Sequence, residues 1–213
     1  MNYNSLTTPQ LIYIITVALI VALIIFLLLF IPLRRRSIKK KYVEHYYKEI
    51  YKIALNNDYY LINTFSFKVD DSSILRINHI LFGEKYVYLI NDYHFDGDIA
   101  GKAFDKSLIC FSKKGKKYYI DNPIVRSKYL LDRLCIMTGL DPSIMIGISL
   151  VNDDCGSEIS STSKQYYLVT RNKLASLIKA IESRNIAKLN EKSLEKLVHS
   201  INKMNRKKKA NNK

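Results

Sequence analysis

The sequence predicts one mixed α/β domain carried on an N-terminal membrane helix. Residues 11–33 form an uncharged apolar run, and beyond residue 37 short β-rich runs alternate with segments of helical periodicity. The chain has 213 residues, of which 48% are apolar and only seven are Gly and four Pro. This size allows one ordinary domain with appendages, and the composition excludes collagen-like and wholly disordered chains.

The apolar run predicts a retained membrane anchor. Its 23 residues would rise roughly 34 Å as a helix, enough to cross a hydrocarbon core of about 30 Å. A cleaved signal peptide would have a basic start, a shorter apolar core and small residues at a cleavage site. Here the first ten residues are uncharged, and arginines follow the run directly.

The flanking charges predict the orientation of this anchor. Six cations follow the apolar run within eight residues: Arg34, Arg35, Arg36, Lys39, Lys40 and Lys41. The positive-inside rule then places the N-terminus outside the cell membrane and the remainder of this single-pass protein in the cytoplasm. Cys110, Cys135 and Cys155 have no CxxC spacing, so we expect reduced thiols rather than disulfides or a zinc site.

The net charge of +15 is concentrated in two short segments. Residues 42–202 hold 22 cations against all 19 acids, which makes the folded part nearly neutral. One basic segment follows the membrane run. The other is the C-terminal tail, with Lys203, Arg206, Lys207, Lys208, Lys209 and Lys213. Such segments suit anionic lipid headgroups or nucleic-acid phosphates, and both partners stay open.

Hydrophobic spacing predicts the first half of the domain. Apolar residues recur every four positions from Ile38 to Ala54, which predicts a helix over residues 38–55. Strands are expected at residues 59–69, 74–82 and 86–90 because these runs are rich in β-branched and aromatic residues. The expected division of the chain is an extracytoplasmic N-terminus at 1–10, the membrane helix at 11–33, a basic juxtamembrane helical linker at 34–48, the α/β domain at 49–186, and a C-terminal helix with the basic tail at 187–213.

The second half of the domain is also predicted to alternate between strands and helices. A lysine-rich turn at residues 113–117 predicts a hairpin over 108–120, and Asn122-Pro123 starts a helix that Gly139 ends. The apolar face of that helix comprises Ile124, Leu130, Leu131, Leu134, Cys135 and Met137. The remaining expectations are strands at 144–151 and 166–169 with a polar loop at 152–164 between them, and helices at 171–183 and 187–204.

The order helix, three strands, helix, strand is that of restriction-endonuclease-like folds, and one stretch makes the likeness more specific. Residues 76–101, RINHILFGEKYVYLINDYHFDGDIAG, resemble the nuclease-related domain (NERD) family. Ile77-Asn78-His79 takes the place of the family's IDH strand, residues 87–93 that of its hydrophobic-I-E-x-K strand, and residues 97–101 that of a glycine motif. Asn122-Pro123 matches the family's NP, with Arg126 where Gln is usual. The resemblance covers roughly residues 49–181.

The resemblance implies a metal-dependent nuclease site whose key residues have changed. The two metal-binding acids fall on Asn78 and Asn91, and the lysine falls on Tyr93. Mg²⁺ prefers charged oxygen ligands, which two neutral amides do not supply. A neutral tyrosine does not replace an ammonium group. We therefore expect a catalytically inactive relative with no cofactor.

A migrated metal site is the alternative, with Mg²⁺ held by Asp92, Asp96 and Asp98. Strand alternation places Asp92 on the face opposite Asn91, which disfavours a shared site. Asp96 and Asp98 flank Gly97 and are more simply explained as turn residues. His79 is expected to be a hydrogen-bonded packing residue.

Two functional classes remain besides an active nuclease. The first is a membrane-tethered nucleic-acid-binding protein that uses the basic tail and Lys113, Lys114, Lys116 and Lys117 against DNA or RNA phosphates. The second is a membrane-anchored scaffold that binds other membrane or cytoplasmic proteins, which the nearly neutral domain favours. The 16 tyrosines show no regular interleaving with cations, so they are expected to be structural.

Overall fold

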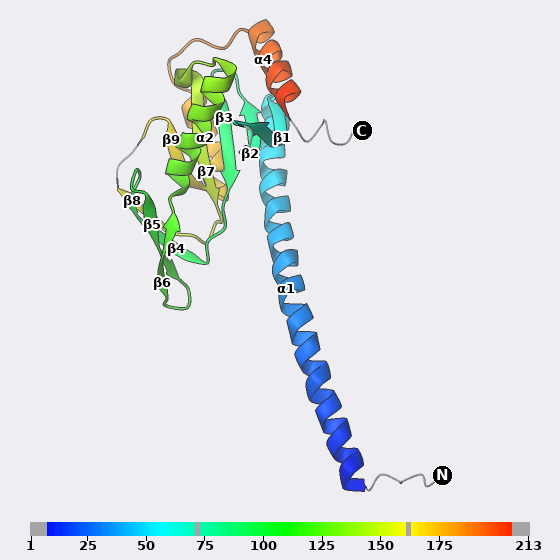
Figure 1. The fold of residues 1–213 in the computed structure, drawn as a ribbon. Coiled ribbons are helices and arrows are strands. Elements are labelled where there is room, and N and C mark those ends of the chain that lie inside the picture. The colour runs from blue at the N-terminus through cyan, green and yellow to red at the C-terminus, as the bar shows by residue number, and fades with distance from the viewer. Residues whose placement is uncertain (1–7, 71–72, 161–162, 206–213) are drawn as a thin grey trace. The chain divides into compact units, whose positions relative to one another are not determined.

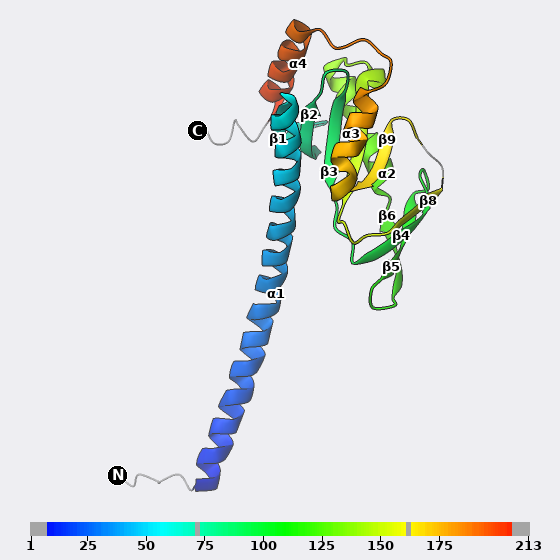
Figure 2. The same cartoon turned by 180° about the vertical axis from the view of Figure 1, so that it is seen from behind.

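The computed structural model describes residues 8–70, 73–160 and 163–205, without the side chains of residues 8–11, 31–41 and 160. The chain divides into two compact units, residues 1–45 and residues 46–213. The described part of the first unit is helical throughout. The second unit contains all strands of the described chain, and it is drawn from two opposite sides in Figures 1 and 2.

Helix α1 spans Thr8–Asn57, so the predicted membrane helix and the helix predicted over residues 38–55 are one continuous helix. Its segment Ile12–Phe30 has a mean hydropathy of 3.3 and exposed side chains, so it is long and apolar enough to cross a membrane. A helix of this kind near an N-terminus serves as a membrane anchor or a signal sequence. The helix ends where the Asn57 amide donates to the Ile53 carbonyl and Asp58 turns to a φ of 56°.

The larger sheet has the strand order β1-β2-β3-β7-β9. Strands β1, β2 and β3 are antiparallel neighbours, whereas β7 and β9 add in parallel to β3. Their bounds are Tyr60–Lys68, Ile74–Phe82, Val87–Asp92, Met145–Val151 and Tyr166–Thr170. All five were predicted. The third extends to Asp92, two residues further than expected, because its pairing with β7 continues to Leu150.

Helix α2, Pro123–Thr138, covers one face of this sheet (Figure 1). The Asn122 side chain accepts a hydrogen bond from the Ile124 N–H at 2.9 Å, and Gly139 ends the helix with a φ of 69°. Both ends were predicted. The predicted apolar face is buried except for Met137, which lies in the last turn of the helix and is 39% exposed.

The opposite face is covered by helix α3, Leu174–Glu182 (Figure 2). A 3-10 turn, Arg171–Lys173, precedes α3, so the α-helix begins three residues later than predicted. Another 3-10 turn, Pro142–Ile144, precedes β7. The last helix, α4, spans Glu191–Met204 and begins after the cap residue Asn190, rather than at residue 187.

A second sheet has the order β6-β5-β4-β8, with bounds Lys117–Asp121, Ser107–Ser112, Gly97–Lys102 and Ser157–Ser160. The predicted hairpin forms β5 and β6. The interpretation of Asp98 as a turn residue was wrong, because Asp98 lies within β4, whereas Asp96 lies in the bend just before that strand. The predicted loop at 152–164 contains β8. Both missed strands are short and rich in Gly and Ser, so neighbouring strands rather than local propensity order them.

One face of the second sheet is buried and the other is open. Ile99, Leu108 and Cys110 point inward and pack with Val151 and Cys155. All three cysteines are free and buried, as expected of reduced thiols. The open face carries Phe111, which is 46% exposed, and Tyr119, which is 74% exposed.

Glu182, the last residue of α3, holds the turn between β2 and β3. Its carboxylate accepts hydrogen bonds from the Tyr88 hydroxyl at 2.7 Å and from the Lys85 N–H at 3.0 Å. A side chain at position 83 would collide with this carboxylate, which favours glycine there. The Lys85 ammonium donates to the Arg184 carbonyl just beyond the helix. Glu182 thereby ties α3 to the sheet.

We expect Glu182 to make stability depend on pH. Burial raises the pKa of Glu182 above its ordinary value of 4.5, so the folded chain holds this proton more tightly than the unfolded chain. The free energy of unfolding should therefore fall as pH rises from 4.5 towards the raised pKa, and level off above it. Glu182→Gln removes this contribution. Denaturant unfolding in micelles should show the slope in the wild type, and equal slopes in both proteins would contradict this role.

Candidate functional site

Asn78 and Asn91, at the positions where the family resemblance implies metal-binding acids, lie side by side on β2 and β3. The Asn78 N–H donates to Oδ1 of Asn91 at 3.2 Å. Asn91 is only 4% exposed, and its Nδ2 has no hydrogen-bond partner within the described chain. The structure thus brings the two residues together, as the resemblance implies, with amides in place of carboxylates.

Tyr93 is the first residue after β3 and lies two residues beyond Asn91 along the chain. Its N–H donates to the Leu150 carbonyl at 2.8 Å, and its carbonyl accepts from the Tyr46 hydroxyl at 2.9 Å. Burial raises the pKa of the Tyr93 phenol to about 12, and the nearby Arg126 guanidinium opposes that rise. Tyr93 is therefore neutral at physiological pH. The guanidinium that opposes the rise in its pKa belongs to Arg126 of α2.

The floor of the site is a neutral hydrogen-bond chain between β7 and the start of α2. Ser149, which pairs in register with Asn91, donates its hydroxyl to the Pro123 carbonyl at 2.9 Å. Its oxygen also lies 2.9 Å from the Ser127 hydroxyl. Both serines are buried. These three oxygens are engaged in hydrogen bonds with one another. None of them carries the negative charge that Mg²⁺ prefers in its ligands.

Asp92 lies on the other face of β3, as strand alternation predicted. Its Oδ2 lies 2.9 Å from Nε2 of His79, and Nδ1 of His79 lies 2.6 Å from Oδ1 of Asn63. The side chains of His79 and Asp92 are each 5% exposed, and Oδ1 of Asp92 has no partner within the described residues. The expectation that His79 is a hydrogen-bonded packing residue is confirmed.

The acids proposed for a migrated metal site do not meet. Asp98 is exposed on β4, where its carboxylate accepts from the Gly156 N–H at 2.7 Å. Asp96 is exposed and offers its backbone carbonyl to the Lys113 N–H. Across the described residues, no group of three or more His, Cys, Asp or Glu side chains could hold a metal ion.

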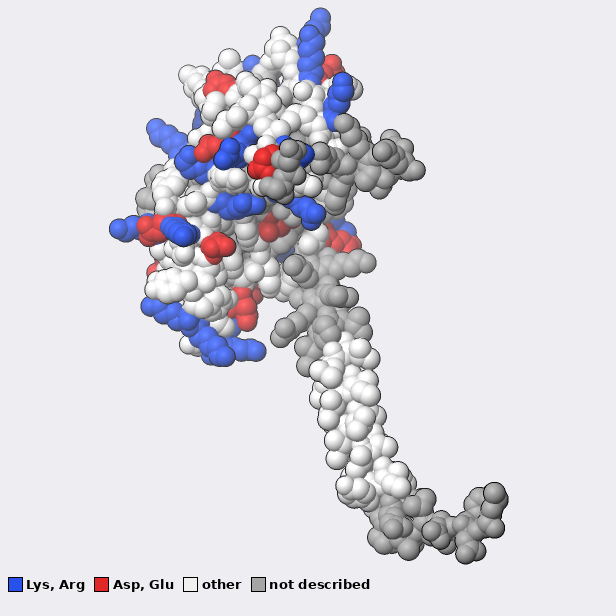
Figure 3. Space-filling model, in the orientation of Figure 1, with Lys and Arg blue, Asp and Glu red and all other residues white. Residues whose placement is uncertain are grey.

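Lysines gather at the turn of the β5–β6 hairpin, where Figure 3 shows a cluster of basic side chains at one end of the domain. Lys113, Lys114, Lys116 and Lys117 lie at this turn, and all four are exposed. Lys113 forms an ion pair with Asp154, and the Lys117 ammonium lies 5.7 Å from the centroid of the Phe111 ring. Hydrogen bonds from Asn152 and Lys113 lower the pKa of Asp154 to about 2, so this partner stays charged.

The other predicted cations are placed only in part. Lys203 is exposed in the last turn of α4. Arg206, Lys207, Lys208 and Lys209 lie outside the described residues. The six cations after the membrane run lie within α1, and their side chains also fall outside the described part. The β5–β6 hairpin is therefore the basic segment that lies wholly within the described residues.

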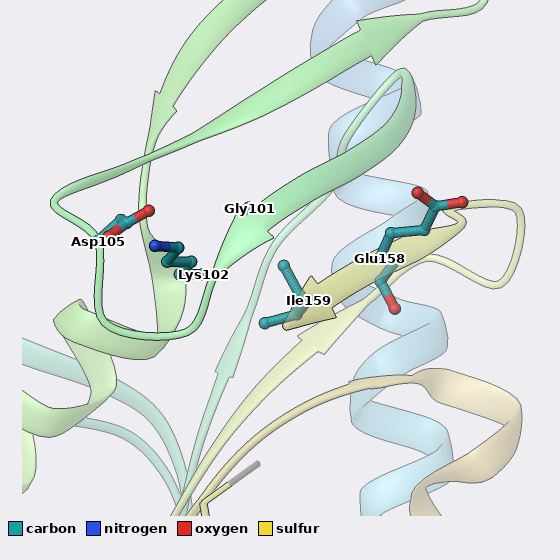
Figure 4. A pocket seen from close by; sticks show the side chains of 6 residues that line it. Gly101, Lys102, Asp105, Glu158 and Ile159 are labelled. Carbon is teal, nitrogen blue, oxygen red and sulfur yellow. The ribbon is translucent and has the colours of Figure 1, made fainter. Parts of the chain in front are cut away.

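A wide hollow of about 700 Å³ lies at the edge shared by β4 and β8 (Figure 4). Lys102 and Asp105 line one side, and Glu158 and Ile159 line the other. The Glu158 carboxylate points away from Lys102, so the charged groups do not converge on one point. This hollow brings together no acid–base pair and no nucleophile with its base among the described residues.

The sequence analysis missed the exposed rings of Phe111 and Tyr119 on the second sheet. Phe111 pairs directly with Lys117, and Tyr119 pairs with Ile109, so all four side chains belong to one face. Residues 108–111 are all apolar, so the sequence carries no alternation that separates the buried Leu108 and Cys110 from the exposed Phe111. Comparison with family models, curated proteins and solved structures finds no match to this chain.

Proposed function

We propose that this chain is a membrane-anchored, catalytically inactive relative of the nuclease-related domain family that binds nucleic acid through its β5–β6 hairpin. The observation that carries the binding is the lysine cluster at the hairpin turn. Four cations within five residues form a local positive surface on an otherwise nearly neutral domain. Such a surface suits phosphate groups.

The arrangement of the larger sheet supports the family relationship. A helix precedes three antiparallel strands, and a second helix leads into a strand that is parallel to the third. This is the order expected of a restriction-endonuclease-like core. The placement of Asn78 beside Asn91, with Tyr93 next along the chain, further supports the assignment.

The loss of nuclease chemistry rests on charge. A divalent metal at this edge would meet the amide of Asn91 and the amide of Asn78, with Tyr93 neutral. The nearby Asp92 is directed to His79 on the opposite face. Metal-assisted hydrolysis would therefore have neither a charged ligand nor a basic group from these positions to support it.

The membrane topology is part of the same proposal. We propose that Ile12–Phe30 is an uncleaved anchor, with the N-terminus outside and the α/β domain in the cytoplasm. Protease added to intact cells should leave the domain undigested, and the mature chain should retain Met1. Secretion of the domain, or a new N-terminus after residue 33, would show instead that the helix is a signal sequence.

Nucleic-acid binding is tested with the full chain in nanodiscs of zwitterionic lipid and a fluorescein-labelled probe of about 20 nucleotides. We expect anisotropy to rise at low ionic strength and to fall steeply with added salt. Changing Lys113, Lys114, Lys116 and Lys117 together to Gln should weaken binding by about tenfold or more. If the wild type shows no salt-dependent binding at low ionic strength, the proposal fails and a protein-binding scaffold replaces it.

A further inference from the structure

The open face of the second sheet combines aromatic rings with the hairpin lysines. Phe111 and Lys117 are direct cross-strand partners, and so are Ile109 and Tyr119. Phe111 and Tyr119 are therefore diagonal neighbours, within reach of one another across the two strands. With exposed fractions of 46% and 74%, these rings present their surfaces to solvent rather than to the core.

Resting on the proposed function, we infer that this face binds single-stranded nucleic acid, with bases stacked on Phe111 and Tyr119 and phosphates against the hairpin lysines. Unpaired bases expose aromatic faces, whereas duplex bases are already stacked on one another. Stacking on protein rings tolerates any sequence, because every base has a π-face. The Lys117 ammonium lies 5.7 Å from the centroid of the Phe111 ring, so a cation is available next to the ring on which a base would stack.

The distribution of charge over this face favours nucleic acid over a membrane surface. The tip of the hairpin is polar, with residues 113–117 consisting of lysines around Gly115, so it offers no apolar side chain for insertion. The rings lie back from the tip, on the strands themselves. Three acids belong to the same face: Glu158 on β8, Asp98 on β4 as the direct partner of Phe111, and the exposed Asp121 at the end of β6 away from the turn. A single-stranded nucleic acid is flexible enough to place its phosphates at the hairpin turn, away from Glu158 and Asp121, whereas a flat anionic bilayer would meet all three acids.

Because the chain contains no Trp, Tyr119→Trp introduces a single fluorescent reporter at the inferred stacking position. In full-length chain held in nanodiscs, we expect oligo-dT of about 20 nucleotides to quench this reporter and to bind at least about tenfold tighter than a duplex of equal length. The control is Tyr118→Trp on the same strand. Tyr118 points to the other face, towards Cys110, so its reporter should change little.

A second experiment removes the two aromatic rings. Phe111→Leu together with Tyr119→Leu should weaken oligo-dT binding by about tenfold or more and leave the weaker duplex binding nearly unchanged. Phe104→Leu is the matched control, because Phe104 is 52% exposed but lies in the loop after β4. Circular dichroism of each variant shows whether it is folded.

The outcomes separate this inference from the proposed function. One outcome is salt-dependent binding in which the Tyr119→Trp reporter is not quenched and oligo-dT binds no tighter than the duplex. That outcome overturns the stacking surface but leaves the binding of phosphates by the hairpin intact. No binding to either probe overturns both. A blue shift of the Tyr119→Trp emission on anionic vesicles, with no response to oligo-dT, would assign the face to the membrane and also overturn the inference.

Discussion

Replacing Asp92 with Ala should lower the free energy of unfolding by about 3–5 kcal/mol, the largest stability effect we expect. The side chains of Asp92 and His79 are each only 5% exposed, and their 2.9 Å contact links β3 to β2. Removal of the carboxylate leaves Nε2 of His79 buried without its partner. The cost of such an orphaned group exceeds the small net gain of an intact hydrogen bond.

Two variants make this test specific. Asp92→Asn keeps an oxygen acceptor of the same shape, so it should cost about 1–2 kcal/mol. Asp96→Ala removes an exposed carboxylate on the same segment and should change stability by less than about 0.5 kcal/mol. Denaturant unfolding of the full chain in micelles measures all three. Equal losses for Asp92→Ala and Asp96→Ala would show that the buried pair has no special importance.

If the proposed family relationship holds, introducing acids at positions 78 and 91 and a lysine at position 93 should create a working nuclease site. The triple variant Asn78→Asp, Asn91→Glu and Tyr93→Lys supplies two charged ligands on adjacent strands and a nearby ammonium. We expect Mg²⁺- or Mn²⁺-dependent cleavage of plasmid DNA to rise from background to a measurable rate. Asn78→Asp alone is the control, since a single carboxylate beside Asn91 does not complete the metal site.

The wild-type chain should remain at the background of a mock preparation in the same assay. Robust cleavage by the wild type, abolished by Asp92→Ala or Asp96→Ala, would instead reveal an active site built from other acids. The Asp92 result must be judged beside its effect on folding, so Asp96→Ala is the cleaner test of that alternative.

The elements of the larger sheet could be predicted because each carries its own pattern. Residues 74–82 and 145–151 are rich in apolar residues, and α2 has both a capping Asn122 and a terminating Gly139. Strands β4 and β8 have no such pattern. Gly97 and Gly101 adopt positive φ, and the two strands pair in parallel although a long stretch of chain separates them. Only the folded chain supplies that pairing.

Only part of the candidate site, too, could be predicted from the sequence. The resemblance placed Asn78 and Asn91 on neighbouring strands, and the structure brings them into contact. The link between His79 and Asp92 needed the register of β2 against β3, which sequence spacing alone does not give. The exposed rings of Phe111 and Tyr119 were missed because tyrosine and phenylalanine are common in buried strands, so their exposure depended on a sheet with one open face.

Binding through the hairpin is tested most directly by the salt dependence of oligo-dT affinity. Each phosphate neutralised on a single strand contributes a log–log slope of about −0.7. If three of the four hairpin lysines engage, changing Lys113, Lys114, Lys116 and Lys117 to Gln should make the slope shallower by about 2 units. The matched control changes four lysines elsewhere in the domain to Gln: Lys173, Lys179, Lys192 and Lys196. The account predicts a nearly unchanged slope for this control, and equal reductions in both variants would contradict it.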